Sequence, residues 1–207
     1  TNYENATGLP SPNEYTTPKD MSLLAQALVR DFPQYYHYFS EREFTYNGIK
    51  QHNRNGLLAR DPTVDGLKTG HTNAAGYCPV TSAQRNGMRL ISVVMGTEST
   101  KARKNDTAAL FNYGFHFYQT KTVFEPNTEL AKPRVWKGQQ DLVPVGVLEL
   151  AALTLPRGKH DNLETTVALN DEIVAPLAVG DAVGTVTVSL DGETKLEVPA
   201  VALEAVE

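Results

Sequence analysis

Three short β-prone segments follow one another within the stretch TVDGLKTGHTNAAGYCPVTSAQRNGMRLISVVMG. They are residues 66–72, 76–84 and 88–96. The last two are separated by Asn86-Gly87, and an Asn-Gly pair readily adopts the positive φ angles of a two-residue hairpin turn. The mostly apolar composition of the third segment indicates burial on both faces. This part of the chain is therefore predicted to form a small sheet whose strands are closely linked in sequence.

Helices are predicted on both sides of these strands in the sequence. Residues 17–31 begin with Thr17, a good helix cap, and Pro18, which suits the first helical position. The apolar positions recur at helical spacing and predict one face, made of Met21, Leu24, Ala25, Leu28 and Val29. A second helix is predicted from Ser99, with its own apolar face made of Ala102, Ala109, Leu110, Tyr113 and Phe117. Asn47-Gly48 predicts a further hairpin between the helices.

The pattern changes near residue 120. Residues 120–207 contain several short β-prone segments, PRVWKG among them, and no convincing helix. Asp191-Gly192 marks another hairpin turn between alternating arms. We therefore predict an α/β (α+β) domain over residues 1–119 and a small all-β sandwich over residues 120–207.

Charge and composition exclude several classes of protein. Residues 1–119 carry 12 Lys and Arg against 10 Asp and Glu, whereas residues 120–207 carry 7 against 14. A nucleic-acid-binding protein would cluster basic residues far more strongly, so the mildly basic part suits a small anionic substrate better. The five histidines and the single cysteine have no metal-ligand spacing, so neither a metal nor another cofactor is expected. There is also no apolar run of membrane-spanning length and no signal-peptide pattern at the start.

The most unusual motif is Lys68-Thr69-Gly70, which lies in the first of the three predicted strands. A glycine after the threonine leaves room for another backbone to lie against that strand. A peptide could then add to the sheet through main-chain hydrogen bonds. On its own, the motif fits a surface turn equally well.

The run NRNGLL…VDGLKTGHT…AGYC…RLISVVMG, followed by a helix and a β-domain, resembles the low-molecular-mass penicillin-binding proteins that are D-alanyl-D-alanine carboxypeptidases. The resemblance covers essentially the whole chain and implies a penicillin-recognising serine enzyme with three signatures, S-x-x-K, S-x-N and K-T-G. S-x-x-K is absent here, and SPN at residues 11–13 fits a structural turn better than an active-site motif. The sequence is therefore expected to begin downstream of both serine motifs, with the nucleophile in a missing N-terminal part of the same protein.

The resemblance implies roles for six residues. Lys68 would supply positive charge and serve in proton relay, and the backbone N–H of His71 would be an oxyanion-hole donor; the His71 side chain is assigned no catalytic task. The implied substrate contacts are Arg54, Thr69, Gly70 and Thr72, with Arg54 and Thr69 reaching the substrate carboxylate.

The resemblance also implies a function and a location. The substrate would be a peptidoglycan stem peptide ending in D-Ala-D-Ala, hydrolysed through an acyl-enzyme, and β-lactams would acylate the same serine. The full protein would be periplasmic and held at the inner membrane by a C-terminal amphipathic helix that this sequence lacks.

Two alternatives remain open. A β-lactamase shares the signatures but needs only a final strand and helix after K-T-G, whereas 137 residues follow Gly70 here. A non-catalytic module that binds peptidoglycan or a partner protein would be consistent with the missing serine motifs.

Overall fold

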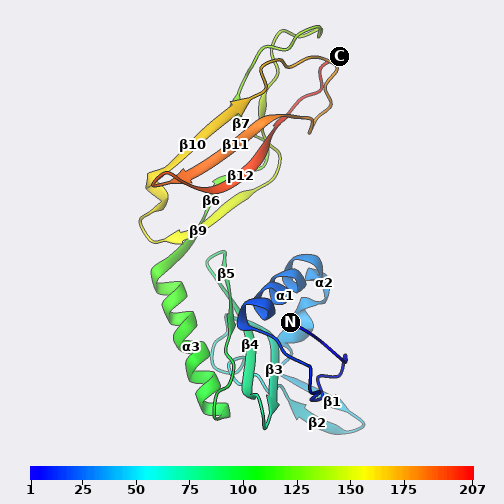
Figure 1. The fold of residues 1–207 in the computed structure, drawn as a ribbon, viewed down its shortest axis with the longest axis vertical. Helices are drawn as coiled ribbons and strands as arrows, with labels where there is room; N and C mark the ends of the chain where they lie inside the picture. The colour runs from blue at the N-terminus through cyan, green and yellow to red at the C-terminus, as the bar shows by residue number, and fades with distance from the viewer. The chain divides into compact units, whose positions relative to one another are not determined.

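The computed structural model describes residues 1–207, which divide into two compact units, Thr1–Phe117 and Tyr118–Glu207 (Figure 1). The boundary predicted from the sequence falls two residues into the second unit, within strand β6 (Tyr118–Phe124). None of the helices combines the length and the hydrophobicity that crossing a membrane requires.

A three-stranded antiparallel sheet forms the centre of the first unit, and it confirms the strands predicted from the sequence. Its strands are β3 (Val64–Thr72), β4 (Gly76–Arg85) and β5 (Met88–Val93), hydrogen-bonded in that order. Asn86 and Gly87 have φ angles of 48° and 78°, so the turn between β4 and β5 forms where the Asn-Gly pair predicted it. Strand β3 pairs only with β4 and is an edge of this sheet.

Two helices pack on the sheet, α1 (Pro18–Asp31) and α3 (Thr100–Phe117) (Figure 1). Residues 79–83 of β4 are all buried, so both faces of this strand are covered. One face of the sheet carries Ser82 and packs against the segment after α1, where the Tyr36 hydroxyl is hydrogen-bonded to Ser82. The other face packs against α3, where Gly114 lies against Leu90. The first unit is therefore layered, with the sheet in the middle, as the α/β prediction required.

The predicted buried face is confirmed for most of α1 and is wrong for α3. The cap of α1 is confirmed, since the Thr17 hydroxyl accepts a hydrogen bond from the Asp20 N–H at 3.1 Å, but Leu24 is half exposed. For α3 the predicted face is wrong. Leu110, Tyr113 and Phe117 are about half exposed, and the buried residues are Arg103, Thr107, Phe111 and Phe115. An apolar pattern could not find this face because two of its four buried residues are polar.

Shorter elements complete the first unit. Helices α2 (Pro33–Tyr36) and η1 (His37–Ser40) follow α1, and strands β1 (Glu43–Tyr46) and β2 (Ile49–His52) form a two-stranded sheet. Asn47, with a φ angle of 48°, and Gly48 form the turn between β1 and β2, as predicted.

A cluster of polar side chains lies beneath the start of β3. The hydroxyls of Tyr36 and Ser82 are 2.6 Å apart, Ser82 donates to an Asp65 carboxylate oxygen at 2.5 Å, and Arg89 pairs with that carboxylate at 2.7 Å. Burial raises the pKa of the Tyr36 hydroxyl, which keeps it protonated. A Cβ on Gly66 would lie 2.7 Å from the Tyr36 oxygen, so only glycine fits there without moving the ring. These contacts fix the strand that carries Lys68.

The second unit is all-β, as predicted, and contains two sheets. Strands β7 (Thr128–Ala131), β8 (Val145–Val147), β10 (Leu163–Leu169), β11 (Ala182–Leu190) and β12 (Glu193–Ala202) form one sheet in the order β10-β11-β12-β8-β7. Strands β6 and β9 (Ala151–Pro156) form the other, and η2 (His160–Asn162) is a short turn. The core is rich in fully buried valines, among them Val143, Val145, Val186 and Val188.

Of two predictions made from the sequence for this unit, one is confirmed and the other is wrong. Asp191 and Gly192 join β11 to β12 with positive φ angles, which confirms that hairpin. The strand predicted at PRVWKG is wrong, because Arg134 and Trp136 form only isolated bridges. No neighbouring segment runs alongside this stretch far enough to form a ladder.

We predict that Tyr36→Phe will destabilise the first unit by about 1 kcal/mol, because it removes a buried hydrogen bond between hydroxyls without removing the ring. Urea unfolding followed by circular dichroism measures the change. Tyr38→Phe is the matched control, since Tyr38 lies two residues away but is 63% exposed, and it should leave the unfolding midpoint unchanged. Equal stability of the wild type and the Tyr36 variant would contradict the structural role given to this cluster.

Candidate active site

The loop between β2 and β3 carries Arg54 and is ordered by its own side chains. The Asn53 carboxamide oxygen accepts the N–H of Asn55 at 2.9 Å, and that of Asn55 accepts the N–H of Leu57 at 3.2 Å. Leu57 and Leu58 are buried and anchor the middle of the loop. Such short asparagine-to-backbone bonds are typical of turns, and they explain why the NRN sequence forms a defined loop.

The end of the loop is held by an ion pair. Arg85 of β4 donates to an Asp61 carboxylate oxygen at 2.6 Å, and the Thr63 hydroxyl donates to the other oxygen at 2.6 Å. Partial burial acts to raise the pKa of Asp61, but the hydrogen bonds from Thr63 and Arg85 outweigh it and lower that pKa below its ordinary value. The carboxylate is therefore charged at neutral pH, and the ion pair is maintained.

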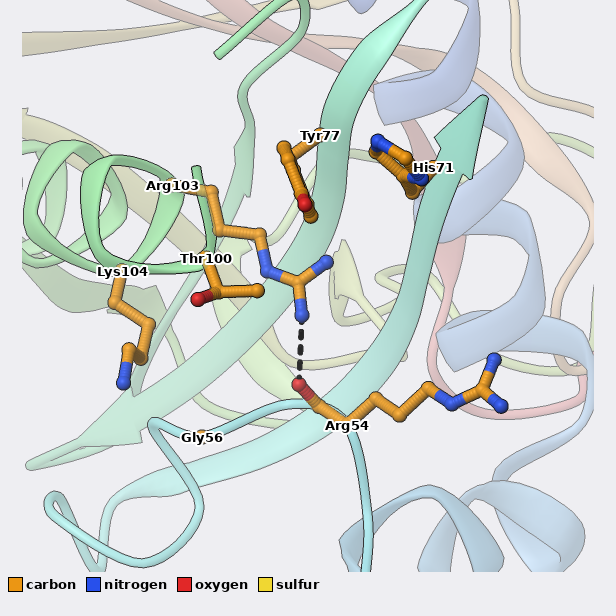
Figure 2. A pocket seen from close by; sticks show the side chains of 7 residues that line it. All are labelled: Arg54, Gly56, His71, Tyr77, Thr100, Arg103 and Lys104. Carbon is orange, nitrogen blue, oxygen red and sulfur yellow. Dashed lines mark hydrogen bonds between the residues drawn. The ribbon is translucent and has the colours of Figure 1, made fainter. Parts of the chain in front are cut away.

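Two buried side chains tie this loop to the rest of the first unit. Asn55, 6% exposed, donates through Nδ2 to the Gly66 carbonyl oxygen at 2.9 Å, two residues before Lys68 on β3. Arg103 of α3, 8% exposed, donates through Nη2 to the Arg54 carbonyl oxygen at 3.0 Å. Figure 2 shows Arg103 reaching this carbonyl while the Arg54 side chain extends away from it. The backbone that carries Arg54 is thus fixed from both sides, whereas its guanidinium is exposed and forms no ion pair within the unit.

A cavity of about 360 Å³ lies where this loop, the sheet and the start of α3 meet (Figure 2). Its lining consists of Arg54, Gly56, His71, Tyr77, Thr100, Arg103 and Lys104. Three of these residues are cations and none is a carboxylate. The cavity also lies at the beginning of α3, where Ser99 accepts the Ala102 N–H at 3.0 Å, and a helix N-terminus adds positive potential. The cavity therefore favours an anionic group.

Aromatic rings line one side of the cavity. The rings of His71 and Tyr77 face each other across the β3–β4 pair with centroids 4.0 Å apart. The Arg103 guanidinium lies 5.4 Å from the centre of the Tyr77 ring, within the range of a cation–π contact. Gly56 allows the close approach of Lys104, since a Cβ on Gly56 would lie 2.9 Å from the Lys104 Cδ atom.

The K-T-G residues lie on β3, next to the cavity lining in sequence but outside it. Lys68 is exposed, and its Nζ atom donates to the Thr69 carbonyl oxygen at 2.6 Å. In the pairing of β3 with β4, Lys68 lies opposite Val80, Thr69 opposite Pro79 and His71 opposite Tyr77. Because successive strand residues point to opposite faces, Lys68 lies on one face of β3, and Thr69 and His71 lie on the other. The only neighbour of a Cβ on Gly70 would be the Cys78 carbonyl oxygen at 3.5 Å, which leaves the outer side of this glycine open.

Thr72, the last of the predicted contacts, lies at the end of β3. Its hydroxyl accepts the Ala75 N–H at 3.0 Å and closes the turn between β3 and β4. The structure thus brings Arg54 and His71 into one cavity, places Lys68, Thr69 and Gly70 along the adjoining strand edge, and gives Thr72 a role in the turn.

Sequence reasoning missed five residues of the cavity, namely Gly56, Tyr77, Thr100, Arg103 and Lys104. The last three come from the start of α3, roughly 50 residues after Arg54 in the sequence. The basic composition of STKARK was the one available signal, and nothing local connects it to NRN. The structure holds no cluster of His, Cys, Asp and Glu side chains suited to a metal ion.

Comparisons with known proteins were made over the whole chain. Residues 1–99 match the family described as D-alanyl-D-alanine carboxypeptidase, and residues 118–207 match the C-terminal domain family of penicillin-binding protein 5. The chain is 42% identical over 208 residues to the D-alanyl-D-alanine carboxypeptidase DacA of Escherichia coli (strain K12), covering 100% of this chain and 52% of that protein. It therefore spans about half the length of this relative.

Solved structures agree with these matches. Penicillin-binding protein 5 from Haemophilus influenzae aligns with a TM-score of 0.87 at 38% identity, covering 100% of this chain and 61% of the other. The cefotaxime-bound penicillin-binding protein D2 from Listeria monocytogenes aligns with a TM-score of 0.52 at 36% identity, covering 56% of this chain and 48% of the other. The penicillin-binding protein fold predicted from the sequence is confirmed.

We predict that Arg103→Ala will loosen the loop that carries Arg54, because the substitution removes a buried charge-assisted hydrogen bond worth about 1.5–3 kcal/mol. Hydrogen–deuterium exchange of the amides at residues 53–58 should accelerate roughly tenfold or more, since 1.4 kcal/mol is a factor of ten. Arg60→Ala is the matched control, because Arg60 is an exposed arginine of the same loop. Exchange that stays at the wild-type rate in the Arg103 variant, or that rises equally throughout β4, would rule out this local role.

Proposed function

Since this chain belongs to the family of D-alanyl-D-alanine carboxypeptidases, with a C-terminal domain of the penicillin-binding protein 5 type, we propose that it forms the substrate-binding half of a serine-type carboxypeptidase. The whole enzyme would remove the terminal D-Ala from peptidoglycan stem pentapeptides. The nucleophilic serine would belong to a part of the enzyme outside this chain, which spans about half the length of the relative from Escherichia coli.

The observation that carries the proposal is the cationic cavity beside the open edge of β3. A stem peptide ends in a carboxylate, and the cavity offers three cations and a helix N-terminus with no competing acid. Arg54 is suited to the carboxylate because its guanidinium is exposed and unpaired, and its planar fork can bond both carboxylate oxygens at once. The Thr69 hydroxyl adds a neutral donor on the same face of β3 as His71.

The strand edge orients the rest of the peptide. No strand is hydrogen-bonded to the outer side of β3, so beyond Gly66, whose carbonyl oxygen is bonded to Asn55, an extended peptide can pair with it through main-chain hydrogen bonds. Gly70 keeps that side free of a side chain. The scissile bond would then lie between the carboxylate site and the strand, and the His71 N–H would donate to its carbonyl oxygen.

The reaction follows the two steps of a serine acyl-transferase. The serine Oγ atom attacks the scissile carbonyl carbon, the C–N bond breaks, and the serine proton is passed to the leaving amine of D-Ala. Lys68 stabilises negative charge near the serine and takes part in this proton transfer. Water then attacks the acyl-enzyme, and the serine regains its proton as the shortened peptide leaves. Thr72 supports the geometry by holding the β3–β4 turn.

The proposal extends to inhibitors and location. A β-lactam would acylate the same serine and place its carboxylate at Arg54; one relative of known structure was solved with cefotaxime bound. The enzyme would act in the periplasm on peptidoglycan, attached to the inner membrane by a segment beyond this chain. It needs no cofactor and no nucleic acid.

We predict that a fluorescent penicillin will stably label a longer polypeptide in which an S-x-x-K serine precedes this sequence, and that the 207-residue chain alone will take no label. Gel electrophoresis with fluorescence detection gives the result. Rapid turnover of the label would indicate a β-lactamase, and absence of label on the longer polypeptide would indicate a non-catalytic module. Either outcome would refute the proposed function.

We predict that Arg54→Ala in the longer polypeptide will lower kcat/KM for D-Ala-D-Ala peptides at least about tenfold, chiefly through KM, because a carboxylate contact is lost in both the bound substrate and the transition state. Arg54→Lys should recover part of the loss. Arg60→Ala, which removes an exposed arginine from the same loop, should have no effect. Steady-state kinetics on the three variants measure this, and unchanged constants for Arg54→Ala would remove the carboxylate role from this residue.

A further inference from the structure

A second cavity, of about 470 Å³, lies entirely within the second unit and plays no part in the proposed reaction. It is bounded by residues 147–152, which are the end of β8, the linker at 148–150 and the start of β9, by Gly180, and by one part of β12. Its lining is almost wholly apolar and consists of Val147, Leu148, Glu149, Leu150, Ala151, Ala152, Gly180, Leu196, Val198, Pro199 and Val201. Both the size and the composition are typical of a binding pocket.

The cavity runs along an edge of β12 that has no strand partner. Strand β12 pairs with β11 over most of its length, from Glu193 to Val201, but it pairs with β8 only at Val201 and Ala202. The side of residues 193–200 that faces away from β11 therefore has no strand hydrogen-bonded to it. Successive strand residues point to opposite faces of a sheet. Val198 and Pro199 both line the cavity, so it follows the edge of the strand and not one of its faces.

Charge around the cavity is acidic. Glu149 is the only charged residue in the lining, and it is exposed and forms no ion pair within the unit. Two further exposed carboxylates lie next to lining residues in sequence, Asp181 after Gly180 and Glu197 before Val198. Lys195, the nearest cation on β12, is paired with Glu193 at 2.6 Å. An apolar occupant that also carries positive charge would complement this surface.

We propose that this cavity, together with the open edge of β12, binds an extended apolar segment of a partner protein flanked by lysine or arginine. The segment adds as a strand beside residues 194–198, and Pro199, which has no N–H, marks the end of the pairing. Alternate apolar side chains of the segment enter the cavity between β12 and residues 148–152. Its basic flanks lie against Glu149 and Glu197.

Protein surfaces normally protect an open strand edge with charge, proline or a covering loop. This edge carries Lys195, Glu197 and Pro199. The linker at 148–150, however, stands beside the edge without pairing to it, and Leu150 in that linker is 57% exposed. The small side chains of Ala151 and Ala152 leave room between the linker and the strand. Main-chain bonds to β12 would supply affinity, while the apolar cavity and the acidic rim would select the sequence that binds.

The test uses the 207-residue chain and, as probe, a short blocked peptide of alternating valine and threonine with a lysine at each end. We expect the amide resonances of residues 148–152 and 194–201 to shift on titration. Glu149→Lys and Leu150→Lys should each weaken binding at least about tenfold, because one reverses the rim charge and the other puts a charge into the apolar cavity. Leu142→Lys and Glu172→Lys are matched controls at exposed positions of the same unit outside the cavity, and they should bind as the wild type does.

Three outcomes would overturn the proposal. The first is equal binding of a peptide with serine in place of valine, or with glutamate in place of lysine. The second is resonance shifts confined to residues outside the cavity and the β12 edge. The third is concentration-dependent association of the chain without peptide, seen by sedimentation and abolished by Leu150→Lys, which would make a second copy of this chain the occupant. Because none of these measurements involves Arg54 or Lys68, they stand apart from the test of the catalytic proposal.

Discussion

A buried guanidinium links the parts of the first unit that carry the candidate site. Burying a charge is unfavourable unless it is hydrogen-bonded, and Arg103 meets this need with the Arg54 carbonyl oxygen and the Tyr77 ring. The contact joins helix α3, the loop after β2 and strand β4. Displacing the loop would remove the hydrogen bond of the guanidinium, and displacing β4 would remove its contact with the Tyr77 ring. The position of the Arg54 backbone is therefore coupled to the docking of α3 on the sheet.

This coupling would allow the exposed Arg54 side chain to make the specific contact that we propose for it. The Arg54 side chain is free, but its backbone is held from α3 by Arg103 and from β3 by Asn55. Binding a carboxylate then requires ordering only the side chain, which lowers the entropic cost of binding. The lining of the cavity contains three cations and no acid, so its potential favours an incoming anion.

The sequence predicted what depends on local signals and missed what depends on distant contacts. The turns at Asn86-Gly87 and Asp191-Gly192 and the cap at Thr17 formed as predicted, since each is determined by a few adjacent residues. The buried face of α3 could not be predicted from the sequence. An arginine is expected to be buried only where a hydrogen-bond partner is available, and the partner here is a backbone carbonyl oxygen in a loop that is remote in the sequence. The family resemblance led to Arg54 and His71, and only the structure added Arg103 and Lys104 to the same cavity.

The two kinds of cation at the site suit different tasks. Arginine presents a planar fork that matches both oxygens of a carboxylate, whereas lysine is a compact charge that exchanges protons more readily. Arg54 stands on a fixed loop, as a contact with a fixed carboxylate requires. Lys68 is exposed, and its side chain is bonded only to the neighbouring Thr69 carbonyl oxygen. Exposed polar contacts contribute little stability, so the Lys68 side chain can turn toward a reacting group at a small cost in stability. Exchanging the two residues would leave the net charge unchanged. It would, however, place a lysine where a planar fork is needed to bind both carboxylate oxygens, and an arginine where proton transfer is needed.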